Sequence, residues 1–303
     1  MILCTGESLI DMVPQDGAFR PLPGGAVYNT AIALGRLGAP TAYLWPISRD
    51  PFGEQLLRPL AEAAVDAGLC PRTDRLTTLA MVTLVDGDAR YFFYDEGSAG
   101  RLFAPEDIPQ LPADVQAIFA GGISLVPDPC GATVEGFIRQ HHARLPVMLD
   151  PNIRPFFISD DEAYRARLDR LLPMSAIVKL SGDDLDWLLP DTPPAEAARQ
   201  ILARGPRLVL VTGGAAGATA YWSGEPVTAP AIRTDVADTI GAGDTFNAGI
   251  LASLQRQGVL SHEGLAALTA EQLHTALTLG AQAAAITVSR PGANPPWAHE
   301  MPA

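Results

Sequence analysis

Lysine is almost missing from this chain. Its 21 basic residues include one lysine, Lys179, and the rest are arginine. A phosphate-binding loop of the G-x-x-x-x-G-K-[ST] type needs a lysine directly after a glycine, and Lys179 follows a valine, so this loop is excluded. A mechanism through a lysine Schiff base would have only this residue as a candidate.

Cysteine and histidine are also scarce. The three cysteines, Cys4, Cys70 and Cys130, are far apart and form no C-x-x-C pair, so the sequence predicts neither a disulfide framework nor a zinc cluster. The five histidines include no H-E-x-x-H motif, and the neighbours His141 and His142 fit a polar, solvent-exposed helix. Metal binding by histidine is therefore not predicted, and a reducing compartment suits the cysteines best.

Long apolar runs and an excess of positive charge are absent as well. The amino terminus reaches the acidic Glu7 before an apolar stretch of signal-peptide length can form, and no window approaches ~18 uninterrupted apolar residues. The 34 acidic residues outnumber the 21 basic ones and give a net charge of −13, which opposes binding to nucleic acid or to an anionic membrane. We therefore expect a cytoplasmic protein without nucleic-acid or membrane partners.

What the chain does contain is material for a large core, since 48% of its 303 residues are apolar and only 18% are charged. Short β-branched or aromatic runs alternate with longer stretches of helical period, which is typical of an α/β fold, a mostly parallel sheet with helices on both faces. The expected strands are 2–5, 41–45, 117–120, 147–150, 176–180 and 207–212, and the expected helices are 27–37, 53–67, 133–144, 161–172, 195–204, 242–256 and 271–288. No repeat or linker divides the chain, so we expect a single domain over residues 1–303.

One segment breaks this alternation. Residues 81–85 and 90–94 are typical of two strands, and Asp86-Gly87-Asp88 between them forms turns readily, which predicts a β-hairpin. No helix follows to cover its aromatic face, so we expect a small β lid, built from about 8–22 and 78–98, that covers a site. An ordinary hairpin at the edge of the main sheet is the alternative.

The last predicted helix carries a face of small residues that includes Gly280, Ala281 and Ala284. Small side chains permit the close approach either of another helix or of a flat ligand, and the sequence leaves both readings open.

The strongest local signal lies in residues 238–249. Gly241, Ala242 and Gly243 lead into an amphipathic helix, whose free N–H groups and positive dipole end form a hole for phosphate oxygens. Asp244 lies in the first turn, where a carboxylate could simply stabilise the helix start. A carboxylate that accepts a hydroxyl proton beside an anion hole is, however, the pair of groups that phosphoryl transfer to an alcohol requires. The segment therefore predicts an alcohol kinase.

Two motifs carry a resemblance to a known family. Residues 238–249 resemble the second motif of the ribokinase-like (PfkB) sugar kinases, and residues 23–31, with a glycine pair and Asn29 before a helix, resemble the first. Similar segments cover essentially the whole chain: 6–11, 50–53, 150–154, 211–218 and 287–293. The start at 6–14, the run 150–155 and the ending look most like those of bacterial fructokinases, and the resemblance implies the ribokinase-like fold.

The resemblance also implies roles for individual residues on the sugar side. Asp244 would be the catalytic base, and the amides of Gly241, Ala242 and Gly243 would hold the phosphoryl charge. Sugar hydroxyls would be bound by a polar set that consists of Asp11, Gly24, Gly25 and Asn29. The lid would bring Tyr91, Phe93 or Tyr94 over the sugar and expel water, while Arg154 is a cation that would favour an anionic substrate.

On the nucleotide side, the resemblance implies ATP with Mg²⁺, which keeps most of its waters and needs few protein ligands. The ATP-binding residues would be Thr212, Gly214, Gly217, Gly280, Ala281 and Ala284. The family's Asn-x-x-Glu element, tied to Mg²⁺ and phosphate, is replaced here by residues 181–184, with both end residues changed, so a role for Asp184 is less directly implied. Lys179 could reach a nucleotide phosphate or lie on the surface. Backbone carbonyls of a monovalent-cation loop, which would make K⁺ an activator, correspond to Asp238, Ile240, Thr287, Arg290 and Gly292.

The choice of sugar depends on the residues after the lid. Family members that phosphorylate 2-keto-3-deoxygluconate often have an arginine there, whereas this chain has Tyr94-Asp95-Glu96. An acidic pair repels an acid sugar and favours a neutral ketohexose, so we expect an ATP-dependent kinase of D-fructose. The alternatives are a kinase of 2-keto-3-deoxygluconate, ribose or a nucleoside, and a non-catalytic sugar or nucleotide sensor. A dinucleotide-binding oxidoreductase is disfavoured because 213–217 lacks the G-x-G-x-x-G spacing. The lid sheet could also pair with a second copy in a homodimer.

Overall fold

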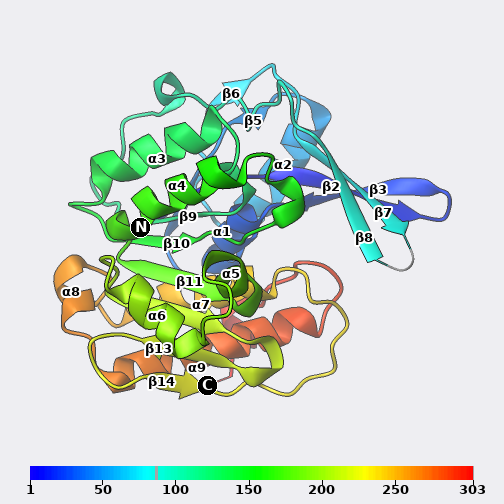
Figure 1. Ribbon diagram of the computed structural model, residues 1–303. Coiled ribbons are helices and arrows are strands. Elements are labelled where there is room, and N and C mark those ends of the chain that lie inside the picture. The colour runs from blue at the N-terminus through cyan, green and yellow to red at the C-terminus, as the bar shows by residue number, and fades with distance from the viewer. Residues whose placement is uncertain (86–87, 303) are drawn as a thin grey trace.

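The computed structural model describes the backbone of residues 1–85 and 88–302 and their side chains, except those of 84, 85 and 88–90. Its centre is a sheet of strands in the order β14-β13-β12-β11-β10-β9-β1-β4 (Figure 1). All neighbours from β12 to β4 are parallel, and β13 and β14 add two antiparallel strands at one edge. The strands are β1 (Ile2–Thr5), β4 (Thr41–Leu44), β9 (Ala117–Gly121), β10 (Val147–Asp150), β11 (Ile177–Ser181), β12 (Leu208–Thr212), β13 (Ala218–Tyr221) and β14 (Val227–Ala229). The predicted mostly parallel sheet is confirmed.

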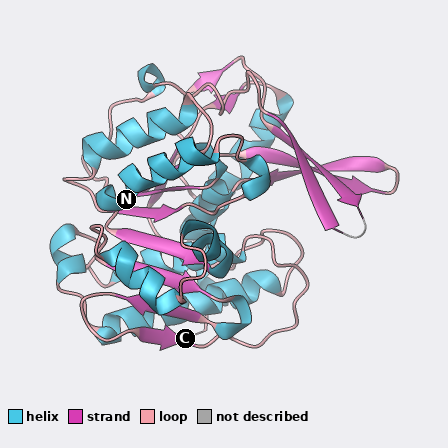
Figure 2. Ribbon diagram, in the orientation of Figure 1, coloured by secondary structure: helices cyan, strands magenta, loops and turns pink. Residues whose placement is uncertain are grey.

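Helices cover both faces of this sheet, as Figures 1 and 2 show. One layer contains α1 (Ala26–Arg36), α7 (Ala242–Arg256) and α9 (Ala270–Val288), which pack against one another. The opposite layer contains α3 (Cys130–His141), α4 (Asp161–Leu171) and α6 (Pro194–Leu202). The remaining helices are α2 (Pro51–Glu62), α5 (Gly182–Leu188) and α8 (His262–Ala266). Short elements complete the chain: β5 (Ile47–Ser48), β6 (Arg72–Thr73), and the 3₁₀ turns η1 (Pro105–Asp107), η2 (Ile123–Leu125), η3 (Pro155–Phe157), η4 (Leu172–Met174), η5 (Gly214–Ala216) and η6 (Ala298–Glu300).

The boundaries of α2 differ from the predicted 53–67. The side chain of Asp50 caps the helix, and Pro51 takes the first helical position, where its missing N–H costs nothing. The helix ends early because Ala64 has a positive φ of 56°, which an α-helix cannot contain. The residues that set the two ends of α2 are not revealed by its apolar period, so the helix begins and ends earlier in the chain than predicted.

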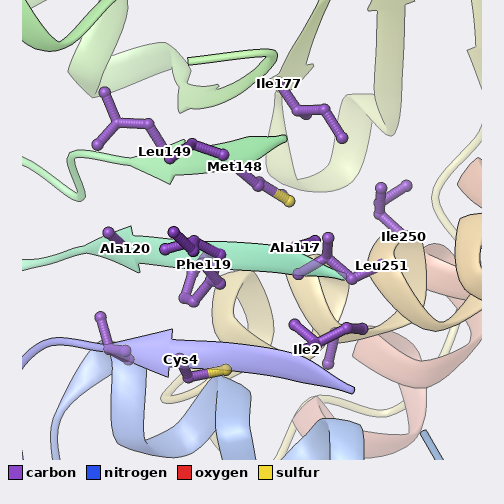
Figure 3. Packing of buried hydrophobic residues seen from close by; sticks show 14 of the residues in the cluster. Ile2, Cys4, Ala117, Phe119, Ala120, Met148, Leu149, Ile177, Ile250 and Leu251 are labelled. Atoms are coloured by element: carbon purple, nitrogen blue, oxygen red, sulfur yellow. The ribbon is translucent and has the colours of Figure 1, made fainter. Parts of the chain in front are cut away.

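The core holds α7 firmly on the sheet. Figure 3 shows Ile2, Phe119 and Met148 of three adjacent parallel strands together with Ile250 and Leu251 of α7, all of them buried. Burial of each large aliphatic side chain stabilises the fold by about 1.5–3 kcal/mol. The start of α7 is thus a rigid feature of the fold. Within the described residues, no helix is both long and apolar enough to cross a lipid bilayer.

A second sheet projects from this body (Figure 1). Its strands are β2 (Leu9–Gln15), β3 (Ala18–Gly24), β7 (Leu79–Val85) and β8 (Asp88–Tyr94), in the order β3-β2-β7-β8. The antiparallel pairing of β7 with β8 confirms the hairpin, although the predicted turn residues Asp86 and Gly87 lie outside the described residues. The alternative of an edge hairpin in the main sheet is wrong, because these strands form their own sheet.

Candidate functional site

The candidate site lies at the edge of the main sheet where the parallel strands end. Glu7 follows β1, Asp150 ends β10, Ser181 ends β11 and Thr212 ends β12. Parallel strands present their carboxyl ends at one edge, and open α/β sheets bind ligands in the crevice there. The residues that the sequence placed on separate segments therefore meet at one edge.

The start of α7 lies at this edge. Gly241 immediately before the helix has a left-handed φ of 78°, and a Cβ there would come within 2.8 Å of the Ala293 side chain, so this position needs glycine. No side chain caps the helix. The amide of Ala242 makes one long hydrogen bond of 3.4 Å to the carbonyl of Thr239, and the amide of Gly243 is left for another acceptor. A cradle of this kind, at the positive end of a 15-residue helix, fits a phosphoryl group.

Asp244 lies in the first turn of α7 and is only 7% exposed. Its Oδ2 accepts a hydrogen bond of 2.9 Å from Nδ2 of Asn29 on α1. Burial raises the pKa of Asp244 to about 7; Asn29 and Lys179 oppose this rise, whereas the negative charges of Asp150 and Glu7 add to it. A general base works best with a pKa near the working pH, so this carboxyl group is suited to take a proton from an alcohol.

Four of the predicted sugar-binding residues make close contacts near the starts of α1 and α7, and one of them, Asn29, contacts Asp244 directly. Gly24 leaves room for the carboxylate of Asp11 on strand β2 of the second sheet, and burial raises the pKa of Asp11 to about 6. At Gly25 the φ is 119° and a Cβ would collide with the backbone carbonyl of Glu7, so the chain passes there only as glycine. Asn29 follows one turn later on α1 and reaches Asp244. The sequence thus predicted a set of residues that the fold does bring together.

Glu7 is a buried member of the site to which the sequence reading gave no role. Its Oε1 accepts a hydrogen bond of 2.9 Å from the amide of Ala26 at the start of α1, and its Oε2 accepts one of 3.1 Å from the amide of Ser124. Burial raises the pKa of Glu7, against the effect of these hydrogen bonds. The available signal was an acidic residue directly after a buried strand.

Aromatic side chains join the second sheet to the loop after β10. Tyr91 and Phe93 stack on Phe156 with ring centroids 5.6 and 6.5 Å apart, and Phe157 meets Phe93 edge to face at 4.7 Å. Phe156 and Phe157 were missed by the sequence reading, because they are far from β8 in the chain. Tyr94 lies on the opposite face of the sheet and is 66% exposed, so its predicted position over the sugar is wrong.

Two cations lie near this aromatic cluster. Arg154 is exposed, donates to the carbonyl of Ile153 and is close enough to Tyr91 to lower its pKa, which burial raises overall. Arg101 forms an ion pair of 2.9 Å with Asp95. One member of the acidic pair on which the argument against acid sugars rested, Asp95, is therefore partly neutralised.

The predicted nucleotide residues lie at the other end of the sheet edge and in α9. Thr212 ends β12, and the following loop, which contains Gly214, is closed by a hydrogen bond of 2.8 Å from the amide of Gly213 to the carbonyl of Gly217. Gly280 faces α7, since a Cβ there would come within 2.9 Å of the Phe246 ring. Helix packing therefore accounts for Gly280. Ala281 and Ala284 on the same helix are half-buried, and the predicted contacts of all these residues with ATP stay predictions.

Asp184 is already satisfied inside the protein. Its Oδ2 accepts from the amide and the hydroxyl of Ser181, both at 2.7 Å, and its Oδ1 accepts from the amide of Ile153 at 2.7 Å. These bonds cap α5 and attach the loop after β10, so they explain the residue without a nucleotide.

Lys179 is buried, with 4% of its surface exposed, so the alternative of a surface lysine is wrong. Its Nζ lies 3.1 Å from Oδ2 of Asp150, which also accepts a hydrogen bond of 2.6 Å from Asn247 of α7. The ammonium group is close to the anion hole, because a Cβ on Gly243 would lie 3.2 Å from Nζ. The sequence reading assigned no role to Asp150 or Asn247.

The segments of the predicted cation loop lie side by side. The carboxylate of Asp238 accepts hydrogen bonds from the amides of Ile240 at 3.0 Å and Gly292 at 2.9 Å. Thr287 is buried and donates to the hydroxyl of Thr245, while the side chain of Arg290 is held away by Glu300. Among the described residues, no group of three or more histidine, cysteine, aspartate or glutamate side chains could hold a metal ion.

Comparison with known proteins agrees with this geometry. The model of the pfkB family carbohydrate kinases matches residues 1–300. A fructokinase from Rhizobium leguminosarum bv. trifolii is 47% identical over 278 residues, which cover 90% of this chain and 85% of that protein. The crystal structure of a fructokinase from Xylella fastidiosa with bound ATP has a TM-score of 0.90 and 32% identity, with 99% of this chain and 94% of that one covered.

A further structural neighbour is a double mutant of the Vibrio cholerae fructokinase in a form with fructose, ADP and potassium ion bound. It has a TM-score of 0.85 at 24% identity and covers 96% of this chain and 93% of that one, a likeness that concerns the fold alone. The predicted family and the ribokinase-like fold are confirmed. The match over nearly the full length, together with the relative at 47% identity, shows that this chain belongs to the pfkB family of carbohydrate kinases.

Proposed function

We propose that this protein is an ATP-dependent fructokinase, which transfers the γ-phosphoryl group of ATP to a hydroxyl of D-fructose. The observation that carries the proposal is the buried Asp244 at the uncapped start of α7, with Asn29 on its sugar side. The 47% identical fructokinase supports fructose as the sugar.

In the proposed reaction Asp244 accepts the proton of the sugar hydroxyl. The hydroxyl oxygen forms a bond to the γ-phosphorus as the bond from phosphorus to the bridging oxygen of ADP breaks. The amides of Gly241, Ala242 and Gly243 stabilise the charge on the transferred group, a contribution that typically depends on donors fixed in place before the reaction. Asp11 and Asn29 hold the other hydroxyls, and Gly25 lets the backbone approach the sugar.

The second sheet is proposed to act as a lid. Tyr91 and Phe93 already contact Phe156 and Phe157 of the body, so closure would place an apolar wall beside Asp11. A wall of this kind excludes water, which would otherwise compete with the sugar for the phosphoryl group.

The acidic Asp11 favours a neutral sugar, because a half-buried carboxylate repels an acid substrate. The cation Arg154 near Tyr91 supports the second candidate, a 2-keto-3-deoxygluconate kinase. An ADP-release assay over D-fructose, 2-keto-3-deoxygluconate, ribose and a nucleoside separates them. We expect the highest kcat/KM for D-fructose; a higher value for another sugar would reassign the substrate. Thermal stabilisation by fructose and ATP without ADP release would instead indicate a sensor.

We further propose Mg²⁺ and K⁺ as the ions that the reaction uses. Mg²⁺ offsets the charge of the triphosphate and would be held mainly by phosphate and water. K⁺ would be held by carbonyls of the loops that Asp238 joins. Chelation with EDTA should abolish turnover and Mg²⁺ restore it, whereas exchange of K⁺ for Na⁺ should change kcat without abolishing it.

Finally, we propose a cytoplasmic homodimer. The three cysteines are buried and free, which suits a reducing compartment. The face of the second sheet that points away from Asp11 carries the exposed Phe19, Phe92 and Tyr94. Several large apolar side chains on one projecting face are typical of an interaction surface, and we assign it to a second copy. Light scattering should give twice the chain mass, and Phe92→Glu should give the monomer.

A further inference from the structure

A buried ion pair lies beneath the anion hole. Lys179 of β11 and Asp150 of β10 are 4% and 2% exposed and lie 3.1 Å apart. Asn247 of α7 donates to the same Asp150 oxygen. Because Asn247 follows Asp244 by three residues, both side chains lie on the same face of α7. The pair therefore connects the sheet edge directly to the helix that carries the proposed base.

The pair is costly as a structural element. Removal of two charges from water often costs more than their attraction returns, and apolar replacements are frequently as stable. In addition, Oδ1 of Asn247 is buried without a hydrogen-bond partner among the described residues, which adds to the cost. Stability alone does not explain charges held at this position, so a functional reason is needed.

The position of the ammonium group supplies such a reason. Nζ of Lys179 lies beside Gly243, next to the anion hole, and because the lysine is buried little water screens its charge. Burial lowers the pKa of Lys179, but the negative charges of Asp150 and Asp184 around it outweigh this effect and raise the pKa, so the lysine stays charged. Asp150 thus fixes the place of this cation, and Asp184 supplies a second negative charge that favours its charged form.

We propose that Asp150 and Lys179 act as a positioning pair, which holds a fixed positive charge beneath the anion hole and sets the pH range in which Asp244 serves as the base. This inference rests on the proposed role of Asp244. The charged groups that face Asp244 are Glu7 after β1, Asp150 of β10 and Lys179 of β11, with Asn29 of α1 as the hydrogen-bond donor and Asp184 of α5 beyond the lysine. Neither member of the pair needs to touch the sugar.

Substitution of Lys179 and substitution of Asp150 should shift the acid limb of the pH profile of kcat/KM in opposite directions. Lys179→Met removes a cation that favours the charged base, so the limb should move to higher pH. Asp150→Asn removes an anion that disfavours it, so the limb should move to lower pH. We expect each shift to be roughly one to two pH units. A purely structural role would lower activity in both variants without opposite shifts.

Removal of Lys179 alone leaves Asp150 buried without its cation, and this variant could fail to fold. The charge-neutral double variant Asp150→Asn/Lys179→Met avoids that problem. It should keep the acid limb close to that of the wild type, because the two effects cancel, while kcat falls by about 10- to 100-fold as the phosphoryl hole loses its cation. Asp150→Asn and the double variant together decide the proposal even if the lysine variant does not fold.

A second readout needs no substrate. In each background, the change in melting temperature caused by Asp244→Asn should vary with pH, with a midpoint at the pKa of Asp244. These midpoints should shift in the same opposite directions as the acid limbs. The matched control is Glu135→Gln, which breaks a buried ion cluster with Arg170 and Arg167 on α3 and α4. It should reduce stability and leave both midpoints and limbs unchanged.

The proposal of a positioning pair would be overturned if the melting-temperature midpoints and the acid limbs of kcat/KM stayed fixed in both variants. It would also be overturned if they moved in the same direction in both. If Asp244→Asn retained wild-type turnover, the proposed function itself would fail. The two failures are therefore distinguishable in one set of variants.

Discussion

The starts of α5 and α7 are two versions of one arrangement. Each helix begins at the same edge of the sheet with a buried aspartate at its third position, Asp184 in α5 and Asp244 in α7. In α5 the residue before the helix is Ser181, and the aspartate accepts three hydrogen bonds from neighbouring protein groups. In α7 the preceding residue is Gly241, and the side chain of Asp244 accepts one bond, from Asn29.

This difference shows what separates a structural carboxylate from a candidate catalytic one. Asp184 uses both oxygens to hold the fold, so it has little capacity left for a ligand. Asp244 keeps unused acceptor positions. Burial disfavours its charged form, and its pKa is therefore raised to about 7. The first amides of α7, which no side chain caps, lie beside it, whereas those of α5 are partly capped by Ser181.

The largest expected effect separates the two aspartates by activity. Asp244→Asn should reduce kcat by about 10²- to 10⁴-fold, because the base for the hydroxyl proton is lost. Asp184→Asn, assayed on folded protein, should change kcat only a few-fold. Steady-state ADP release measures both, and fructose binding by calorimetry should remain in the Asp244→Asn protein. Equal losses in the two variants would erase the distinction drawn between the helices.

Stability should show the reverse order. Asp184→Asn turns an acceptor into a donor that faces other donors, so we expect a loss of about 2–4 kcal/mol in the free energy of unfolding near neutral pH. Denaturant titration followed by circular dichroism measures this loss. An unchanged midpoint for Asp184→Asn would mean that its three hydrogen bonds contribute nothing to the fold.

Asp244→Asn should instead stabilise the protein, and the gain should depend on pH. The folded pKa of Asp244, about 7, lies above its ordinary value of 3.8, so the folded state binds the proton more tightly than the unfolded state does. The favourable contribution of wild-type Asp244 is complete below pH 3.8 and is lost as the pH rises through 7. Relative to wild type, the variant should therefore gain up to about 1.4 kcal/mol for each unit between these values.

The check is a series of thermal melts from pH 4 to pH 8.5. The difference between Asp244→Asn and wild type should be small at the acid end and largest above pH 7. Asp11, whose pKa is also raised, makes the same contribution to the pH dependence of stability in both proteins, so its effect cancels in the difference. A constant difference over this range would show that the carboxyl group of Asp244 titrates normally.

The smallest effect concerns the caps themselves. Ser181→Ala removes a side-chain cap from α5 and should cost about 1 kcal/mol, with kcat unchanged. Gly241→Ala, at the equivalent position of α7, should cost more, because alanine tolerates neither the left-handed backbone nor the contact with Ala293. It should also reduce kcat, since the amides of the hole would shift. Similar losses of stability and an unchanged kcat in both variants would argue against a preformed anion hole at the start of α7.

Several features of the fold and site were predictable from local sequence. The bounds of β1, β10 and α7 agree with the predicted ranges, because each has a clear apolar period and a distinct start or stop. The start of α7 after Gly241 was also predictable, because small residues there lead into a segment with a helical apolar period. By contrast, the ends of α2 were misjudged, because a side-chain cap and a positive φ set them.

Contacts between distant segments were not predictable in this way. Asp150, Lys179 and Asn247 come from three elements, and no spacing in the chain connects them. The position of Tyr94 depends on strand alternation in a sheet whose register is set by its neighbours. The aromatic contact of Phe93 with Phe157 likewise needs the second sheet to be placed against the loop after β10.

The sequence by itself determined the alternation of strands and helices, the glycine-rich start of α7 and the family, because these depend on periodicity and on residues that are neighbours in the chain. Only the tertiary structure decided which carboxylates have unused acceptor positions, that Lys179 is buried, and which groups face the proposed base. The physical reason is that hydrogen-bond saturation and desolvation are properties of a packed environment, and packing brings together residues that are far apart in sequence.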